Sequence, residues 1–170
     1  MKNNAEIIPF LGINDIDFNK KRKDYVQILG VPSVYINELV MPCIVIDRFQ
    51  DKGLQIYYDM EKDYLPFAIE ITKKYGGLLF GKNLFGKSFD EIKSLLNSDF
   101  VYKEIFDNII QIDNPSIWLT FTDKWKLYSV TIFREGYSTY ISEKMAGDRP
   151  KVSLSGAERE KKYGKYYKFE

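Results

Sequence analysis

One segment of the chain has the spacing of a phosphate-binding loop. The residues from Gly81 to Ser88 read GKNLFGKS and satisfy the P-loop pattern G-x-x-x-x-G-K-[ST]. In a P-loop, backbone N–H groups surround the phosphates, while Lys87 would reach the β and γ oxygens and Ser88 would bind Mg²⁺. A nucleotide-binding enzyme is therefore the alternative hypothesis, with Lys87 and Ser88 as its cofactor-binding residues.

The sequence around this segment favours a structural role. Leu84 and Phe85 are bulky apolar residues in a loop that would have to wrap closely around phosphates, which is more typical of core anchors. Ser88 and Glu91 form the capping box S-x-x-E, which begins a helix. The neighbouring strands alternate like antiparallel hairpins, whereas a P-loop fold needs parallel strands joined by helices.

The composition excludes several other chemistries. Histidine is absent from the 170 residues, so no Ser-His pair, Cys-His pair or histidine-ligated metal can form. The only cysteine, Cys43, lies in an apolar run, and we expect a buried thiol there. Several carboxylates cluster around the first predicted hairpin without calcium-loop spacing, so we expect solvated turn charges, no metal and no cofactor. These carboxylates are Asp47, Asp51, Asp59, Glu61, Asp63 and Glu70.

Charge and hydropathy restrict the partners. The net charge of +1 comes from 25 basic and 24 acidic residues, so no strong field indicates nucleic acid or a membrane. The first ten residues lack the apolar region of a signal peptide, and no apolar run approaches the ~20 residues of a membrane span. We therefore expect a cytoplasmic protein. The basic and aromatic residues interleaved in the C-terminal KKYGKYYKFE suggest a third hypothesis, weak binding of nucleic acid or an acidic partner.

The sequence predicts a β-hairpin over 53–71, which would position the candidate functional residues. Leu54, Ile56 and Tyr58 alternate with polar residues, a charged turn follows, and the alternation resumes from Leu65 to Ile71. Such a hairpin is not stable alone in water, so another element must cover its apolar face.

The rest of the chain predicts two helices and further strands. One helix is expected after Asp17 as its cap and before Gly30, and the other begins at Ser88. Residues 42–49 predict a strand, and residues 101–112 are ambiguous between strand and helix. Residues 117–121 and 128–132 alternate on either side of a turn, and the apolar period fades after residue 137.

The two halves of the sequence resemble each other. Leu54, Ile56 and Tyr58 match the residues at 117, 119 and 121 with a constant offset of 63. We therefore predict an α+β fold, with a mainly antiparallel sheet built from two pseudo-repeated helix–hairpin units and both helices packed on one face. Residues 1–144 would form a single domain, and 145–170 a polar, basic tail.

The strand alternation also predicts a binding surface. Three aromatic residues fall in phase with the side of the sheet that faces away from the helices, a fourth lies at a turn, and two carboxylates lie near the first of them. Exposed aromatic residues often mark binding surfaces, although a loop or the tail could instead cover them. The candidate partner-binding residues are Tyr57, Asp59, Glu70, Trp118, Trp125 and Phe133. Carboxylates on this face would suit a partner with a basic surface.

Several short sequence motifs follow one another along the chain. They are Asp47-x-Phe49, GLQIYYD at 53–59, FAIE at 67–70, LFGKNLF at 79–85, DEIKSLL at 90–96 and GY at 136–137. In this order the chain resembles a family of small bacterial cytosolic proteins, mostly uncharacterised, some of which are similar to toxin-immunity proteins. The stretch DFNKKRKDYVQILG is only loosely like the opening of that family, and the tail has no counterpart in it. The resemblance implies an α+β fold, no catalytic residues and a protein partner, such as a toxin domain. Our leading hypothesis is therefore a non-enzymatic, immunity-type inhibitor.

Overall fold

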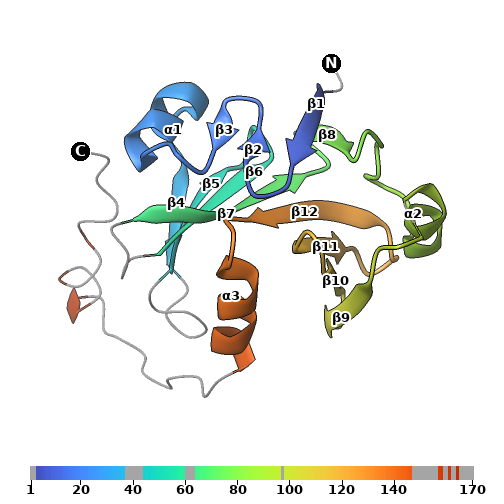
Figure 1. Cartoon of the computed structure of the whole chain (residues 1–170). Helices are drawn as coiled ribbons and strands as arrows, with labels where there is room; N and C mark the ends of the chain where they lie inside the picture. Colours follow the sequence, from blue (N-terminus) through green and yellow to red (C-terminus); the bar gives the residue numbers. More distant parts are fainter. Residues whose placement is uncertain are drawn as a thin grey trace.

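The computed structural model describes residues 3–36, 44–59, 64–96 and 98–146, together with 157, 158, 161 and 164. They form a large sheet of eight strands, in the order β4-β5-β6-β7-β12-β11-β10-β9, and a small sheet of four, in the order β3-β2-β1-β8 (Figure 1). Within these residues the β1–β8 pairing is parallel and every other pairing is antiparallel. The predicted α+β class with a mainly antiparallel sheet is confirmed.

The large sheet contains the predicted hairpin. Its strands are β4 (Ser33–Ile36), β5 (Ile44–Phe49), β6 (Leu54–Asp59), β7 (Leu65–Thr72), β9 (Tyr102–Phe106), β10 (Ile109–Ile112), β11 (Ile117–Phe121) and β12 (Leu127–Phe133). In the β6–β7 hairpin, Leu54 pairs with Ile71 and Ile56 with Ile69, as the alternation predicts. The ambiguous residues 101–112 form a second hairpin from β9 and β10, which pairs with β11.

The small sheet covers part of the large one. It consists of β1 (Asn3–Ile8), β2 (Gly12–Ile13), β3 (Ile16–Asp17) and β8 (Gly76–Leu79). Ile7, Ile13 and Leu79 are buried in the same cluster as the apolar residues of β6, β7, β11 and β12. Gly12 is required in β2, where it pairs with Asp17 of β3, because its φ is +146° and a Cβ there would lie 2.0 Å from the carbonyl oxygen of Ile16.

The first helix begins later than the sequence predicts. α1 spans Arg22–Leu29, and Lys21 occupies its N-cap position. The predicted cap Asp17 is wrong, because this residue ends β3 and its carboxylate accepts from Asn19 N (2.8 Å) and Lys20 Nζ (3.0 Å). The predicted end is confirmed, since Gly30 N donates to the Val26 carbonyl at 2.9 Å.

The second helix begins where the capping box predicts. α2 spans Phe89–Leu95. Ser88 N donates to Glu91 Oε2 at 2.6 Å, and Glu91 N donates to Ser88 Oγ at 3.4 Å. These bonds and Lys126 lower the pKa of Glu91 to about 2. The capping box is confirmed.

The large sheet has two differently covered faces. On the inner face, Tyr25 of α1 and Ile92 of α2 belong to one buried cluster with the small sheet. On the outer face, Ile141 of a third helix, α3 (Tyr137–Ala146), lies in a separate cluster with Phe67 and Phe133. Figure 1 shows α3 on the opposite side of the sheet from α1. The fading period after residue 137 did not predict this helix.

A buried ion pair joins α1 to the inner face. Arg22 donates from Nε and Nη2 to the carboxylate of Asp47, at 2.7 and 2.6 Å. Asp47 lies in register between Val34 and Ile56 and is fully buried. The expectation of a solvated turn charge is therefore wrong for Asp47, because a bidentate arginine compensates its burial.

Some expectations concern other parts of the chain. Cys43, Glu61, Asp63 and most of the predicted tail over 145–170 lie outside the described residues. In the part of the chain that the structure describes, no helix is long and apolar enough to cross a membrane.

Candidate functional site

The P-loop-like segment uses its backbone donors within the chain. Leu84 is buried in the inner cluster and Phe85 packs against it, as expected of core anchors. Four N–H groups are already bonded: Gly81 to Glu6 Oε1 (2.9 Å), Gly86 to the Leu127 carbonyl (2.9 Å), Lys87 to the Leu84 carbonyl (3.1 Å) and Ser88 to Glu91 Oε2 (2.6 Å). A P-loop would direct such donors at phosphates. This geometry argues against nucleotide binding at Lys87 and Ser88.

The outer face carries a continuous row of cross-strand partners, one from each strand of the large sheet. In sheet order from β4 to β9, they are Ser33, Arg48, Gln55, Glu70, Thr131, Trp118, Gln111 and Lys103. Polar residues occupy most positions, because the apolar partners of the same strands face the inner cluster. The outer face is therefore where the chain collects side chains that the main core does not use.

At the β4–β7 end of this row the side chains form hydrogen bonds with one another. Arg48 Nε donates to Gln55 Oε1 at 3.0 Å, and Gln55 Nε2 donates to Glu70 Oε2 at 3.0 Å. The hydroxyl of Tyr57 donates to the same Glu70 oxygen at 2.5 Å. Burial and the charge of Glu70 raise the pKa of Tyr57 well above its usual value. The guanidinium of Arg48 also lies over the ring of Tyr35, 4.2 Å from its centroid.

The predicted aromatic residues lie at the other, covered part of the face. Trp118 and Phe133 are in contact, with ring centroids 4.8 Å apart, and they are only 7% and 2% exposed. Both lie outside the inner cluster, as their phase predicts, but they belong to the buried cluster of α3. Their predicted exposure is therefore wrong, because Ile141 and Tyr137 of α3 pack over this end of the sheet.

The remaining candidates are separated. Asp59 ends β6 and is only 2% exposed, so the expectation of a solvated turn charge is wrong for this residue too, and it offers little to a partner. Trp125 is 45% exposed at the β11–β12 turn, and its ring lies 5.7 Å from Phe121 of the inner cluster. Of the six predicted partner-binding residues, the structure bonds Tyr57 to Glu70 and brings Trp118 and Phe133 together under α3.

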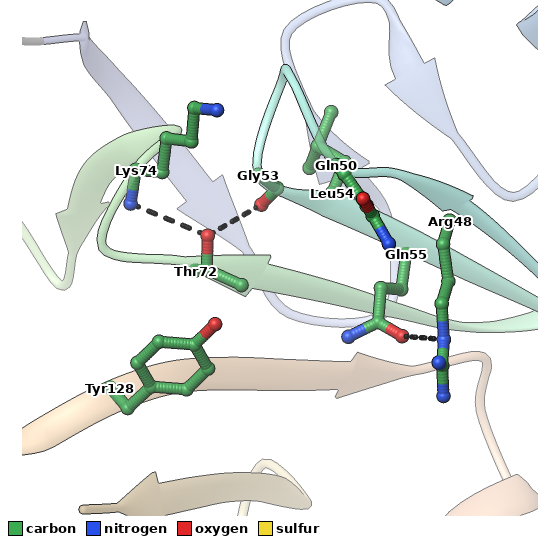
Figure 2. A pocket seen from close by; sticks show the side chains of 8 residues that line it. All are labelled: Arg48, Gln50, Gly53, Leu54, Gln55, Thr72, Lys74 and Tyr128. Carbon is green, nitrogen blue, oxygen red and sulfur yellow. Dashed lines mark hydrogen bonds between the residues drawn. The ribbon is translucent and has the colours of Figure 1, made fainter. Parts of the chain in front are cut away.

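An open cavity lies beside the bonded polar side chains. Its volume is about 470 Å³, and its lining is Arg48, Gln50, Gly53, Leu54, Gln55, Thr72, Lys74 and Tyr128 (Figure 2). Thr72 Oγ1 donates to the Gly53 carbonyl at 2.9 Å and accepts from Lys74 N at 3.3 Å, which ties the two strand ends together. A Cβ at Gly53 would meet this hydroxyl at 2.6 Å, so glycine is needed for the approach. We call the cavity and its lining the open end.

Sequence reasoning missed the open end. Arg48, Gln55 and Thr72 share the outward phase of Tyr57 and Glu70, so the hairpin alternation already placed them on the same face. Because these three side chains are neither aromatic nor acidic, they were not among the predicted binding residues. Among the described residues, no group of three metal-ligating side chains is close enough to hold an ion.

Comparison with protein-family models, curated proteins and solved structures finds no match. The resemblance to toxin-immunity proteins therefore stays a prediction.

Proposed function

We propose that the chain is a non-enzymatic protein-binding protein that meets its partner with the open end of the outer face, most concretely as an immunity-type inhibitor of a bacterial toxin. The observation that carries the proposal is the bonded series Arg48–Gln55–Glu70–Tyr57 beside an open cavity. Side chains fixed by one another on adjacent strands lose little conformational freedom on binding, so a partner gains affinity from them.

The element order supports a finer inference about how this surface arises. α1 precedes β4, β5, β6 and β7, α2 precedes β9, β10, β11 and β12, and β7 pairs with β12 at the middle of the large sheet. We infer two pseudo-repeated units whose helices cover the inner face. In this view α3 breaks the symmetry, because it packs on one end of the outer face and leaves the other for a partner.

The hydrogen bonds of the P-loop-like segment favour this proposal over the nucleotide-binding enzyme. We expect the wild type to bind neither ATP nor GTP, so Lys87→Ala should leave nucleotide binding unchanged. Micromolar nucleotide binding by the wild type that disappears in Lys87→Ala would favour the enzyme.

The surface is tested with two exposed aromatic residues on opposite faces. Tyr128 lines the open end and is 48% exposed, whereas Trp125 lies beside the inner cluster. The full chain and its Tyr128→Ala and Trp125→Ala variants are co-expressed with the product of the adjacent gene, and growth and complex formation are measured. We expect Tyr128→Ala to weaken the complex about tenfold or more and to reduce protection, as for an interface aromatic residue.

Trp125→Ala should bind and protect as the wild type does. The proposal is wrong for this surface if Trp125→Ala is the weaker variant or both behave as wild type. A wild type that forms no complex and gives no protection contradicts the immunity function.

A further inference from the structure

The open end carries positive charge that its own lining does not neutralise. Arg48 and Lys74 are its charged residues, and no carboxylate is among the eight lining side chains. The nearby Glu70 already accepts from Tyr57 and Gln55. The exposed Asp51 lies 4.0 Å from Lys74 Nζ, a contact that water screens.

Arg22 of α1 and Arg48 of β5 have different partners. The comparison shows which hydrogen-bond donors of Arg48 are not used within the chain. Arg22 gives Nε and Nη2 to the buried carboxylate of Asp47. Arg48 gives Nε to the neutral Gln55 amide, and within the described residues its guanidinium forms no ion pair with a carboxylate. A guanidinium presents five N–H donors in a planar fork that fits a carboxylate. Arg48 therefore retains donors for an anion from outside the chain.

Arg48 is also held in place. The Tyr35 ring lies under its guanidinium at 4.2 Å, and the Gln55 amide is fixed in turn by Glu70. In Figure 2, Arg48 and Gln55 lie on one side of the cavity, and Lys74 and Tyr128 lie towards the other. A side chain that is already ordered pays little entropy to bind, so Arg48 is suited to anchor a partner.

A second cavity extends the surface past Arg48. Its volume is about 370 Å³, and it shares Arg48 and Gln50 with the first cavity. The apolar side of its lining includes Leu29 and Val31, and Val31 is strongly exposed. Arg48 thus lies between two hollows, the central position in which arginine contributes most to interfaces.

We infer that Arg48 receives a carboxylate from an acidic segment of the partner protein, an inference that rests on the proposed function. It reverses the expectation of a basic partner, because Asp59 is buried and Glu70 is bonded within the chain. One arginine and one lysine with Glu70 and Asp51 nearby match a singly charged carboxylate better than a phosphate, whose second charge those acids would repel.

The test uses the purified full chain and three defined probes at low salt. They are a capped peptide with two glutamates flanking a tyrosine, the same peptide with lysines in place of the glutamates, and sodium phosphate. Backbone amide NMR shifts follow each titration. We expect the acidic peptide to bind saturably, with shifts at Arg48, Gln55 and Tyr128, and the lysine peptide and phosphate to bind at least about tenfold more weakly.

Two charge reversals make the result specific. Arg48→Glu should weaken the acidic peptide at least about tenfold, whereas Lys23→Glu, the same change on the exposed side of α1, should alter it less than about twofold. Circular dichroism verifies the fold of each variant. If Arg48→Glu does not fold, Lys74→Glu replaces it, with a weaker but measurable loss expected because Lys74 is mostly exposed.

Three outcomes overturn the inference. They are phosphate binding as tight as the acidic peptide, equal binding of both peptides, and binding that Arg48→Glu does not change. Each leaves the Tyr128 and Trp125 comparison intact, so failure of this inference is distinguishable from failure of the proposed function.

Discussion

The two ends of the outer sheet face share the strands β5, β7 and β12, but one end is buried and the other is open to solvent. At the covered end, Phe67, Trp118 and Phe133 pack beneath α3. At the open end, Arg48 and Tyr128 border a cavity. Strand alternation assigns a side chain to one face of a sheet, but an element elsewhere in the sequence decides whether that face reaches solvent. The aromatic residues that looked like binding anchors are a second core.

The helix that makes this difference has a readable pattern. Tyr137, Tyr140 and Ile141 are spaced i, i+3 and i+4, the spacing of one helical stripe. Their rings and side chain join the outer cluster, with Phe67 and Tyr137 stacked at 5.4 Å. A stripe of only three residues next to Gly136 is easily missed, but it matches the apolar patch that β7 and β12 expose.

Two truncations to alanine should distinguish the two ends most clearly by their effect on stability. Phe133→Ala should lower the free energy of unfolding by about 3–5 kcal/mol, because a buried ring is replaced by a cavity. Tyr128→Ala should change it by about 0.5 kcal/mol or less, since about half of this residue is exposed and it belongs to neither buried cluster. Denaturant unfolding measures both. Equal effects would mean that the covered end is not a core.

The cover itself can be removed. A chain that ends at residue 136 lacks α3 and exposes Phe67 and Phe133, so it should lose about 2–4 kcal/mol of stability, the value of one or two buried apolar side chains. A chain that ends at residue 146 keeps α3. It should melt within a few degrees of the full chain, because the residues beyond it are polar and lack an apolar period. A large loss in the longer chain would contradict the prediction of a tail that contributes little to the core.

The boundary between the ends is the Glu70 carboxylate. Glu70→Ala leaves the Tyr57 hydroxyl and the Gln55 amide without their acceptor and should cost about 1–3 kcal/mol. Glu70→Gln keeps an acceptor oxygen and should cost less. If the two substitutions have the same effect, the hydrogen bonds to Glu70 do not order the open end.

The sequence predicted most of the framework and little of the site. The hairpin over 53–71, the strands at 117–121 and 128–132, and the capping box at Ser88 depend on short-range patterns, and they are confirmed. The fold class followed from these elements. The small sheet required a parallel pairing between β1 and β8, which are some 70 residues apart in sequence, and no local pattern specifies such a pairing.

The site depended on burial, which alternation does not determine. Alternation places Asp47 and Arg48 on opposite faces, but it shows neither that Arg22 compensates the burial of Asp47 nor that Arg48 borders a cavity. Tyr57 and Trp118 share the outward phase, yet Trp118 is buried in the outer cluster, whereas Tyr57 is only partly buried and packs against its edge. These differences arise from α1 and α3, which contact the sheet from distant parts of the chain.

The smallest predicted effect concerns the titration of Tyr57 at the boundary. Burial and Glu70 raise the pKa of Tyr57 above its unfolded value of about 10, so the folded chain keeps a proton that the unfolded chain loses. The stability that this proton gives is fully present below about pH 10 and is lost as the pH rises towards the folded pKa. This one group should lower the free energy of unfolding by up to about 1.4 kcal/mol per pH unit above pH 10.

Tyr57→Phe should cost about 1 kcal/mol at pH 7, the value of one hydrogen bond. The variant should then lose stability less steeply than the wild type at alkaline pH, so the two unfolding curves converge near pH 11. Trp125→Ala, which removes no titrating group, should keep the wild-type slope. Parallel curves for Tyr57→Phe and the wild type would show that Tyr57 reaches solvent as freely in the folded chain as in the unfolded one, and would move the boundary of the open end to include it.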